Sequence, residues 1–244
     1  MTGTAGLRRK GSYGVDAPIV IVIFAVVLAA NVVNVFLGRS VWLLLPVLFL
    51  LACLASCLYT TRRGKFVVWA ELLGQLRLRG DEQILDMGCG RGAVLLMAAQ
   101  YLTTGRAVGV DLWRNWDQSG NSADATRRNA AAEGVADRVE LCTSDIRALP
   151  FADCCFDLVV SSLAIHNISG TAGRDRAIDE AVRVLRPGGR VVIADIRATG
   201  RYRQRLTELG MTDDGRRRLG WRFWWGGPWA STRLVTARKP ERPG

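Results

Sequence analysis

The sequence predicts an α/β fold, a mainly parallel sheet with helices on both faces, preceded by two transmembrane helices. Three observations support this prediction. Two long uncharged apolar runs stand near the start of the printed sequence, short apolar runs then alternate with helical segments, and a glycine-rich turn follows the first short run. Strand–helix alternation with short turns is typical of a parallel sheet that is covered on both faces.

The two apolar runs cover residues 17–37 and 41–59, and neither contains a charged residue. Each approaches the ~20 residues that a helix needs to cross ~30 Å of hydrocarbon. Only Gly-Arg-Ser separates the runs, so we expect a hairpin that crosses the membrane and returns. A cleaved signal peptide, a buried hairpin of a soluble protein and a shallow re-entrant hairpin are the alternatives.

The charges that flank the hairpin predict its orientation. The connecting loop carries Arg39 alone, whereas three basic residues precede the first run and three follow the second: Arg8, Arg9, Lys10, Arg62, Arg63 and Lys65. Because positive charge marks the cytoplasmic side, we expect both ends of the hairpin in the cytoplasm. The predicted parts are a cytoplasmic tail (1–16), the hairpin (17–60), a juxtamembrane helix and linker (61–82) and an α/β domain (83–240), also cytoplasmic.

The overall composition narrows the choice of partners. The chain has 244 residues, 49% of them hydrophobic, and carries 33 Lys and Arg against 22 Asp and Glu. This basic balance fits nucleic acid, anionic lipid or a merely arginine-rich composition. The arginines are scattered without a long basic arm, which argues against nucleic acid. The six cysteines form no metal-ligand pattern, so we expect reduced thiols and no metal site.

The soluble part begins after Thr60 and alternates in type. Strands are expected at the short apolar runs and helices where the periodicity is helical. Strands are predicted at 83–88, 106–111, 138–145, 156–163 and 190–196, and helices at 65–78, 92–102, 123–134, 174–185 and 202–210. The aromatic segment 219–240 is predicted to form a terminal antiparallel hairpin around a Gly-Gly-Pro turn. Its tryptophans either pack within that hairpin or form a surface at the membrane interface.

A glycine-rich turn joins the first strand of the domain to the next helix. The stretch from 84 to 92 has the pattern Asp-x-Gly-x-Gly-x-Gly, with Asp86 at the strand end. In open parallel sheets ligands bind at such turns, where glycines allow close backbone approach. No Gly-Lys-Ser/Thr follows, which excludes a P-loop. The next two strands also end on acids: Asp111 is placed to accept ribose hydroxyls, and Asp145 to receive an adenine amine.

The motifs along the chain resemble those of class I S-adenosylmethionine-dependent methyltransferases. They are LDMGCGRG, GVD, SDIRALPF, FDLVVS and RVLRPGG, and the match runs from about Lys65 to Lys239. Within the superfamily the sequence is similar to the small-molecule branch, which includes quinone and natural-product methyltransferases. The resemblance implies a Rossmann-like seven-stranded sheet, S-adenosyl-L-methionine as cofactor and a small-molecule acceptor.

The resemblance also implies roles for particular residues. Asp86, Gly88 and Gly90 would form the loop under the methionine part of the cofactor, and Asp111 would bind the ribose hydroxyls. The other expected contacts flank the adenine, hold its edge or lie beside the methyl group: Leu112 and Trp113, Asp145 and Ile146, and Ser161, Ser162 and Leu163, respectively. For any one of the glycines or acids, a tight turn or a helix cap is the simpler explanation.

The loop after Asp111 departs from the family pattern. It is longer and more aromatic than usual, with the sequence LWRNWDQSGNS. We hypothesise that Trp113 and Trp116 form part of a lid over the cofactor or the substrate. The alternative is that both tryptophans only pack the loop against the surface.

His166 is the only histidine of the chain and follows the fourth predicted strand of the domain by a few residues. We predict that it is the catalytic base, because a hydroxyl or amine acceptor loses a proton when it is methylated. A histidine that only hydrogen-bonds the loop backbone is one alternative. Methyl transfer by positioning alone, with no base, is another.

The predicted function is that of a membrane-anchored methyltransferase that acts by O- or N-methylation on a small, apolar or membrane-associated acceptor. The hairpin would hold the active site near the bilayer. The fourth strand lacks the NPPY-like stretch that indicates methylation of adenine in nucleic acid. A non-catalytic cofactor-binding scaffold and an RNA methyltransferase are the alternatives; salt-sensitive RNA binding would support the latter.

Overall fold

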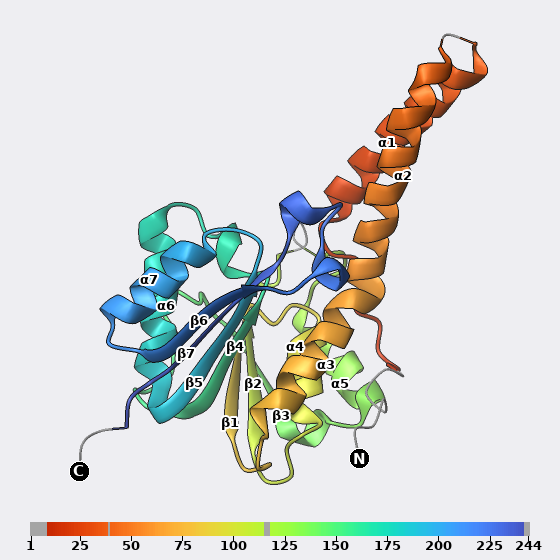
Figure 1. Ribbon diagram of the computed structural model, residues 1–244. Helices are drawn as coiled ribbons and strands as arrows, with labels where there is room; N and C mark the ends of the chain where they lie inside the picture. Colours follow the sequence, from red (N-terminus) through yellow and green to blue (C-terminus); the bar gives the residue numbers. More distant parts are fainter. Residues whose placement is uncertain (1–8, 39, 115–117, 242–244) are drawn as a thin grey trace.

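The computed structural model describes residues 9–38, 40–114 and 118–241, which form an α/β domain and a projecting helical hairpin (Figure 1). In the described residues the domain has one seven-stranded sheet of order β3-β2-β1-β4-β5-β7-β6. The strands are β1 (Gln83–Met87), β2 (Arg106–Asp111), β3 (Val139–Thr143), β4 (Phe156–Ser162), β5 (Leu185–Asp195), β6 (Thr212–Arg218) and β7 (Arg233–Arg238). Strands β1 to β5 pair in parallel, and β7 lies antiparallel between β5 and β6. The predicted mainly parallel, seven-stranded sheet is confirmed.

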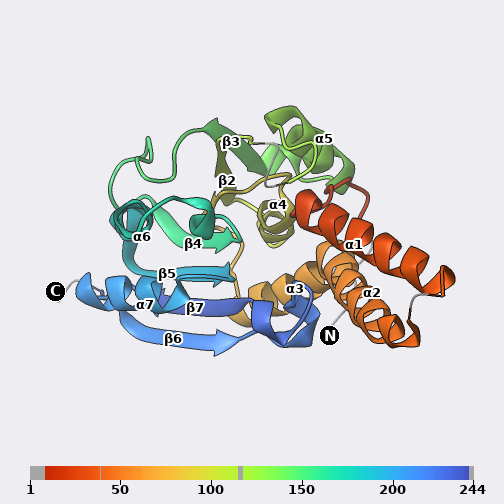
Figure 2. The ribbon, with the colours of Figure 1, turned by 90° about the horizontal axis from the view of Figure 1, so that it is seen from above.

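Helices cover both faces of the sheet (Figure 2). One face carries α3 (Lys65–Leu76), α4 (Ala93–Ala99) and α5 (Ala123–Glu133), and the other carries α6 (Thr171–Val184) and α7 (Thr199–Glu208). Each face has its own apolar cluster, because successive side chains of a strand point to opposite sides. The carboxyl ends of the parallel strands lie together at one edge of the sheet, which is where open parallel sheets bind ligands.

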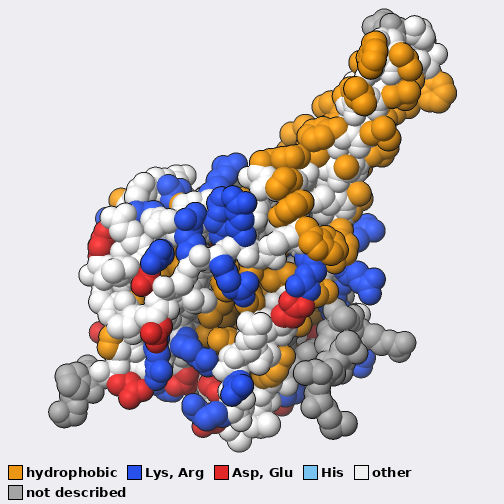
Figure 3. Space-filling view, viewed as in Figure 1, with side chains coloured by type: hydrophobic (Ala, Val, Ile, Leu, Met, Phe, Trp, Pro, Cys, Tyr) orange, Lys and Arg blue, Asp and Glu red, His pale blue; other side chains and the backbone are white. Residues whose placement is uncertain are grey.

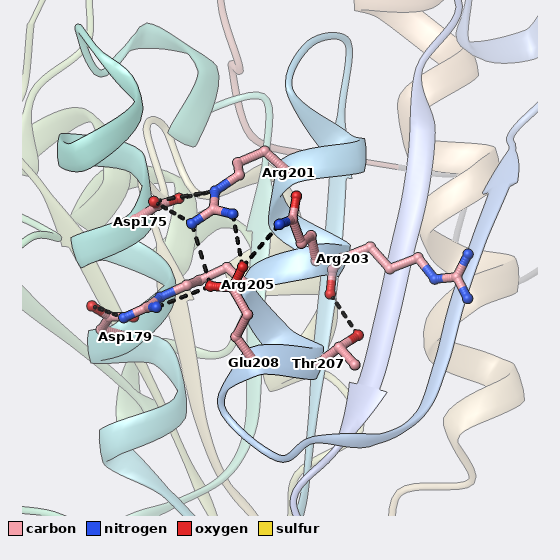
Figure 4. A network of polar contacts seen from close by, with 8 residues as sticks. Asp175, Asp179, Arg201, Arg203, Arg205, Thr207 and Glu208 are labelled. Carbon is pink, nitrogen blue, oxygen red and sulfur yellow. Dashed lines mark hydrogen bonds and ion pairs between the residues drawn. The ribbon is translucent and has the colours of Figure 1, made fainter.

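A network of charged side chains joins α6 to α7 (Figure 4). Arg201 Nη2 lies 2.7 Å from Asp175 Oδ2, and Arg205 Nε lies 2.7 Å from Asp179 Oδ1. Glu208 accepts from both arginines and completes the network. These pairs hold the two helices together and belong to the scaffold rather than to the site.

The hairpin consists of α1 (Pro18–Phe36) and α2 (Leu44–Tyr59), and α2 continues through a π-helical turn (Thr60–Gly64) into α3. Both hairpin helices are candidates for crossing a membrane by length and composition. None of the apolar window of α1 is buried, and only 17% of the window in the second helix is buried. Apolar side chains cover the projecting part (Figure 3). A soluble protein would bury such a surface, so these exposures argue against a buried hairpin.

The tail before α1 packs on the domain. Tyr13 is buried, and its hydroxyl donates to Glu133 Oε1 at 2.9 Å. Asp16, next to the start of α1, forms an ion pair with Lys65 at the start of α3. The described part of the tail therefore ties the base of the hairpin to α5 and to α3.

The C-terminal region differs from the prediction. Its antiparallel pair is β6 with β7, and β6 ends at Arg218, before the aromatic stretch begins. Residues 219–232 form a loop with two 3₁₀ turns, η6 (Trp221–Phe223) and η7 (Pro228–Ala230). The predicted hairpin around the Gly-Gly-Pro turn is present only as an isolated antiparallel bridge between Trp224 and Ser231. The loop packs against the hairpin instead of the sheet: a Cβ added to Gly64 would lie 1.8 Å from the Arg222 carbonyl oxygen. Tertiary packing thus overrides the strand propensity of the aromatic residues.

Candidate active site

A cavity of about 700 Å³ lies at the carboxyl ends of the parallel strands, beneath the hairpin. Its lining combines the β1–α4 turn, the ends of β2 and β4, and the first turn of α1. The volume falls within the ~300–1,000 Å³ typical of ligand sites. Among the residues predicted from sequence, the cavity is lined by Asp86, Gly88, Gly90, Asp111, Leu112, Asp145, Ile146, Ser162, Leu163 and His166.

The β1–α4 turn depends on glycine at two positions. Gly88 has a φ of +77°, and an added Cβ would lie 2.2 Å from the Cβ of Ala164. Gly90 has a φ of +50°, and an added Cβ would lie 2.5 Å from Gln118 Oε1. The turn therefore brings bare backbone to the cavity, as a bound ligand requires.

We expect Gly88→Ala to lower the free energy of unfolding by about 3 kcal/mol, because the new methyl group clashes with Ala164 and because alanine disfavours a positive φ. Thermal denaturation measures this loss. Gly134 has nearly the same φ, +73°, but nothing within 4 Å of its added Cβ. Gly134→Ala should cost only about 1 kcal/mol. Adding Ala164→Gly should restore part of the stability of Gly88→Ala; no recovery would contradict the steric explanation.

Asp86 is a buried carboxylate without a partner. Its side chain lies at the end of β1 with 1% of the residue exposed, and neither oxygen accepts a hydrogen bond within the described residues. Burial, with a smaller contribution from the nearby Asp111 carboxylate, raises the pKa of Asp86 to about 8. A buried carboxylate of this kind is completed by a cation. The ammonium of the methionine part of S-adenosylmethionine fits this requirement.

Asp111 fixes the turn to the end of β2. Its Oδ2 accepts from the Gly90 N–H at 2.9 Å, and its Oδ1 accepts from the Trp113 N–H at 2.6 Å and from Asn121 Nδ2 at 3.3 Å. A carboxylate has about four acceptor sites, so one remains for a ribose hydroxyl. The carboxylate is thus held in place by backbone on both sides.

Two of the predicted cofactor contacts need correction. Trp113 lies outside the cavity lining, and its Nε1 donates to Thr143 Oγ1 at 2.7 Å. Ser161 is buried, and its Oγ donates to the Met87 carbonyl at 2.8 Å. The prediction that these two side chains contact the cofactor is therefore not supported. Trp116, the other half of the hypothetical lid, lies outside the described residues.

Asp145 lines the cavity but already has a partner. Arg147 Nε donates to both of its oxygens, at 3.0 and 2.9 Å, and this hydrogen bonding lowers the pKa of Asp145. An adenine amine would therefore share this carboxylate with Arg147, which the sequence had not singled out. Ile146 is buried beside it and also lines the cavity; its expected contact with the adenine edge stays a prediction.

Ser162 and His166 lie on the other side of the cavity, after β4. Ser162 Oγ accepts from Trp69 Nε1 at 2.9 Å, which places a fully buried tryptophan of α3 over the end of the strand. His166 Nδ1 lies 2.6 Å from Asp195 Oδ1, and the His166 backbone N–H donates to Asp195 Oδ2 at 3.0 Å. With Nδ1 turned to Asp195, Nε2 is the atom left for an acceptor.

Asp195 was missed in the sequence. It is fully buried at the end of β5, and Tyr202 donates its hydroxyl to Oδ2 at 3.3 Å. The signal was present: like Asp86 and Asp111, it is an acid that ends a buried parallel strand. Asp195 is a positioning residue, since it reaches the cavity only through His166.

Apolar side chains outside the nucleotide-binding turn also line the cavity. They are Trp69 of α3, Trp225 of the C-terminal loop, and Ile19 and Val20 of α1, with the Asp16–Lys65 ion pair beside the start of α1. The same cavity thus extends from the cofactor turn to the first turn of an exposed apolar helix.

Comparison with known proteins agrees with this geometry. Residues 85–193 match the family described as "Methyltransferase domain". The demethylmenaquinone methyltransferase of Symbiobacterium thermophilum is 34% identical over 53% of this chain and 49% of its own length. The ubiquinone/menaquinone biosynthesis C-methyltransferase UbiE of Roseobacter denitrificans is 33% identical over 52% of this chain and 48% of its own. The sterol 4-C-methyltransferase strm-1 of Caenorhabditis elegans is 30% identical over 52% and 35%, respectively.

Solved structures show the same fold. Geranyl diphosphate C-methyltransferase from Streptomyces coelicolor A3(2) is 18% identical and superposes with a TM-score of 0.56, covering 70% of this chain and 74% of that one. A SAM-dependent methyltransferase from Aquifex aeolicus gives a TM-score of 0.54 at 17% identity, over 69% and 87%. At such identities the likeness concerns the fold alone.

The fold and the site define a Rossmann-like α/β domain. Its central part, residues 85–193, matches a methyltransferase domain, and the cofactor that its turn and acidic strand ends fit is S-adenosyl-L-methionine. The chain spans about half the length of the first two curated relatives described above, and about a third of the sterol enzyme. The activity of the whole protein is therefore a proposal.

Proposed function

We propose that the protein transfers a methyl group from S-adenosylmethionine to a small apolar acceptor that it takes from a membrane. One observation carries the proposal: a single cavity is lined at one end by the cofactor turn with Asp86 and at the other by Ile19 and Val20 of α1. An acceptor held among the hairpin residues would therefore lie next to the methyl donor. The names of the curated relatives, which act on quinones and a sterol, support an apolar acceptor.

The membrane location rests on the hairpin. Its apolar side chains are exposed, and basic residues flank both of its outer ends. We infer that the hairpin lies in the membrane, with the chain ends and the methyltransferase domain on the cytoplasmic side. In this arrangement the part of the cavity that is lined by Ile19 and Val20 would lie near the bilayer surface.

Residues of the cavity would bind the cofactor, orient the acceptor and remove a proton from it. When bound, the cofactor supplies an activated methyl group. Asp86 would hold its ammonium and Asp111 its ribose, while the apolar walls exclude water from the acceptor. His166 Nε2 would take the proton that the acceptor loses, with Asp195 holding the ring. The sequence predicts O- or N-methylation, whereas two of the relatives are named C-methyltransferases. In all three reactions the acceptor can lose a proton.

The test is a transfer assay with methyl-labelled S-adenosylmethionine and a membrane lipid extract from the source organism. We expect label in the organic phase with the wild type and none with Asp86→Asn, which serves as the matched control. Label that stays in water would overturn the apolar acceptor. Calorimetry on the detergent-solubilised protein measures S-adenosylmethionine binding. Normal cofactor binding without methyl transfer to any acceptor fraction would support the alternative of a non-catalytic scaffold.

A further inference from the structure

The loop between β6 and β7 contains a long uncharged stretch beside the hairpin. Residues 223–232 read FWWGGPWAST, and charged residues stand immediately outside, at Arg222 and Arg233. Arg222 donates to Glu71 of α3 from both terminal nitrogens. The charged boundary of the loop is thus fixed to the domain, at the base of the hairpin.

The loop follows the hairpin upward from this base. Trp221 stacks on Tyr59 at the end of α2, with ring centroids 5.3 Å apart, and Trp229 lies against Phe49 at 5.6 Å. Ten residues of helix separate these two contacts, which corresponds to about 15 Å along the axis. Gly226 lies between them, close to Phe24 of α1. The loop therefore accompanies the hairpin for about half of its length.

Several backbone groups of the loop are paired within the protein. The Trp224 carbonyl accepts from Thr60 Oγ1 at 2.6 Å and from Ser56 Oγ at 3.3 Å. The Trp225 N–H donates to the Ala230 carbonyl at 3.0 Å, and the Thr232 N–H donates to the Phe223 carbonyl at 3.1 Å. Irregular backbone is tolerated at membrane depth only when protein groups pair it in this way.

The exposed apolar surface continues at the level of the loop. Ile19 and Ile23, in the first turns of α1, are 61% and 54% exposed, and Trp229 is 63% exposed. A bilayer that ended above the loop would leave these side chains in water. It would also leave only about 10 Å of hairpin, from Phe49 to Trp42, to enter ~30 Å of hydrocarbon.

We propose that residues 223–232 form a third membrane-embedded element, which contacts phospholipid acyl chains in the cytoplasmic leaflet through Trp229. The proposal rests on the membrane location of the hairpin. Trp225 and Ala230 of the same loop line the cavity, so the loop is the wall between the cavity and the lipid. An apolar acceptor would then enter sideways from this leaflet, past the loop and the first turn of α1.

The experiment measures tryptophan fluorescence of the full chain in nanodiscs made with phosphatidylcholine, either unbrominated or brominated on the acyl chains. Three variants are compared with the wild type: Trp229→Phe, Trp42→Phe at the hairpin tip, and Trp113→Phe in the domain. We expect Trp229→Phe and Trp42→Phe each to lose part of the quenched signal and Trp113→Phe to lose none, because only tryptophans near the bromines are quenched.

The outcomes separate this proposal from the one on which it rests. If Trp42→Phe loses quenched signal and Trp229→Phe does not, the hairpin is in the membrane but the loop is not embedded, and the present proposal is overturned. If neither variant loses signal, the hairpin itself is outside the bilayer, and the membrane location fails with it. Circular dichroism of each variant confirms that the fold is unchanged.

Discussion

Asp86→Asn is expected to weaken S-adenosylmethionine binding roughly a hundredfold, about 3 kcal/mol, because it removes the carboxylate that would pair with the cofactor's ammonium in a buried site. Titration calorimetry near pH 7 measures the loss. Asn has nearly the same shape as Asp, so the cavity and the turn should persist. An unchanged Kd would show that the ammonium binds elsewhere.

The raised pKa of Asp86 gives this prediction a second readout. The free carboxyl, with a pKa of about 8, is mostly protonated at pH 7, whereas the ammonium of the cofactor requires the ionised form. Binding should therefore release about one proton, and the affinity should rise up to tenfold per pH unit as the pH increases toward 8. Calorimetry in buffers of different ionisation enthalpy counts the proton. Asp86→Asn should release none.

The same shift predicts a pH dependence of stability without cofactor. The folded pKa of Asp86 lies above the ordinary value of ~3.9, so between these two values the folded state binds more protons than the unfolded state. Its contribution to stability is present at low pH and is lost as the pH rises toward 8. The Tm of the wild type should therefore fall more than that of Asp86→Asn over this range. Parallel curves for the two proteins would contradict the raised pKa.

Much of the site follows from the ends of strands. Buried parallel strands are recognisable from short apolar runs, and their carboxyl ends meet at one edge, so Asp86, Asp111 and Asp145 could be placed together before any coordinates were known. The same reasoning applied to β5 would have indicated Asp195. The pairing of Asp145 with Arg147 could not be derived, because it depends on a rotamer within a loop.

Other features depend on contacts that a linear pattern does not contain. Ser161 and Ser162 are adjacent polar residues, and only the pleat of β4 decides which one meets the cavity. The aromatic stretch after β6 has strong strand propensity, yet it packs on α2, where Ser56 and Thr60 offer hydroxyl donors to its backbone. Strand propensity predicts an element well when the segment pairs with neighbouring strands of the sheet. It predicts poorly when a helix that is distant in sequence provides the hydrogen-bond partners.

Asp195→Asn is expected to lower kcat by about 10²–10³, because the carboxylate 2.6 Å from His166 Nδ1 would favour the orientation and tautomer that leave Nε2 free to accept a proton. Cofactor affinity should not change, since neither side chain belongs to the cofactor turn. His166→Gln should lose at least as much activity. The measurements are single-turnover rates with a methyl acceptor identified in the transfer assay.

Two further variants decide whether Asp195 acts through His166 or only supports the fold. Tyr202→Phe removes the hydroxyl that donates to Asp195 Oδ2 but keeps the carboxylate 2.6 Å from His166 Nδ1, so its activity should stay within a few-fold of the wild type. In the double variant Asp195→Asn/His166→Gln, the two losses should not add, because each single change already removes the same proton transfer. Losses that multiply would mean that the two residues act independently, so that Asp195 does not act through His166. His166→Gln with full activity would show that His166 has no part in the chemistry.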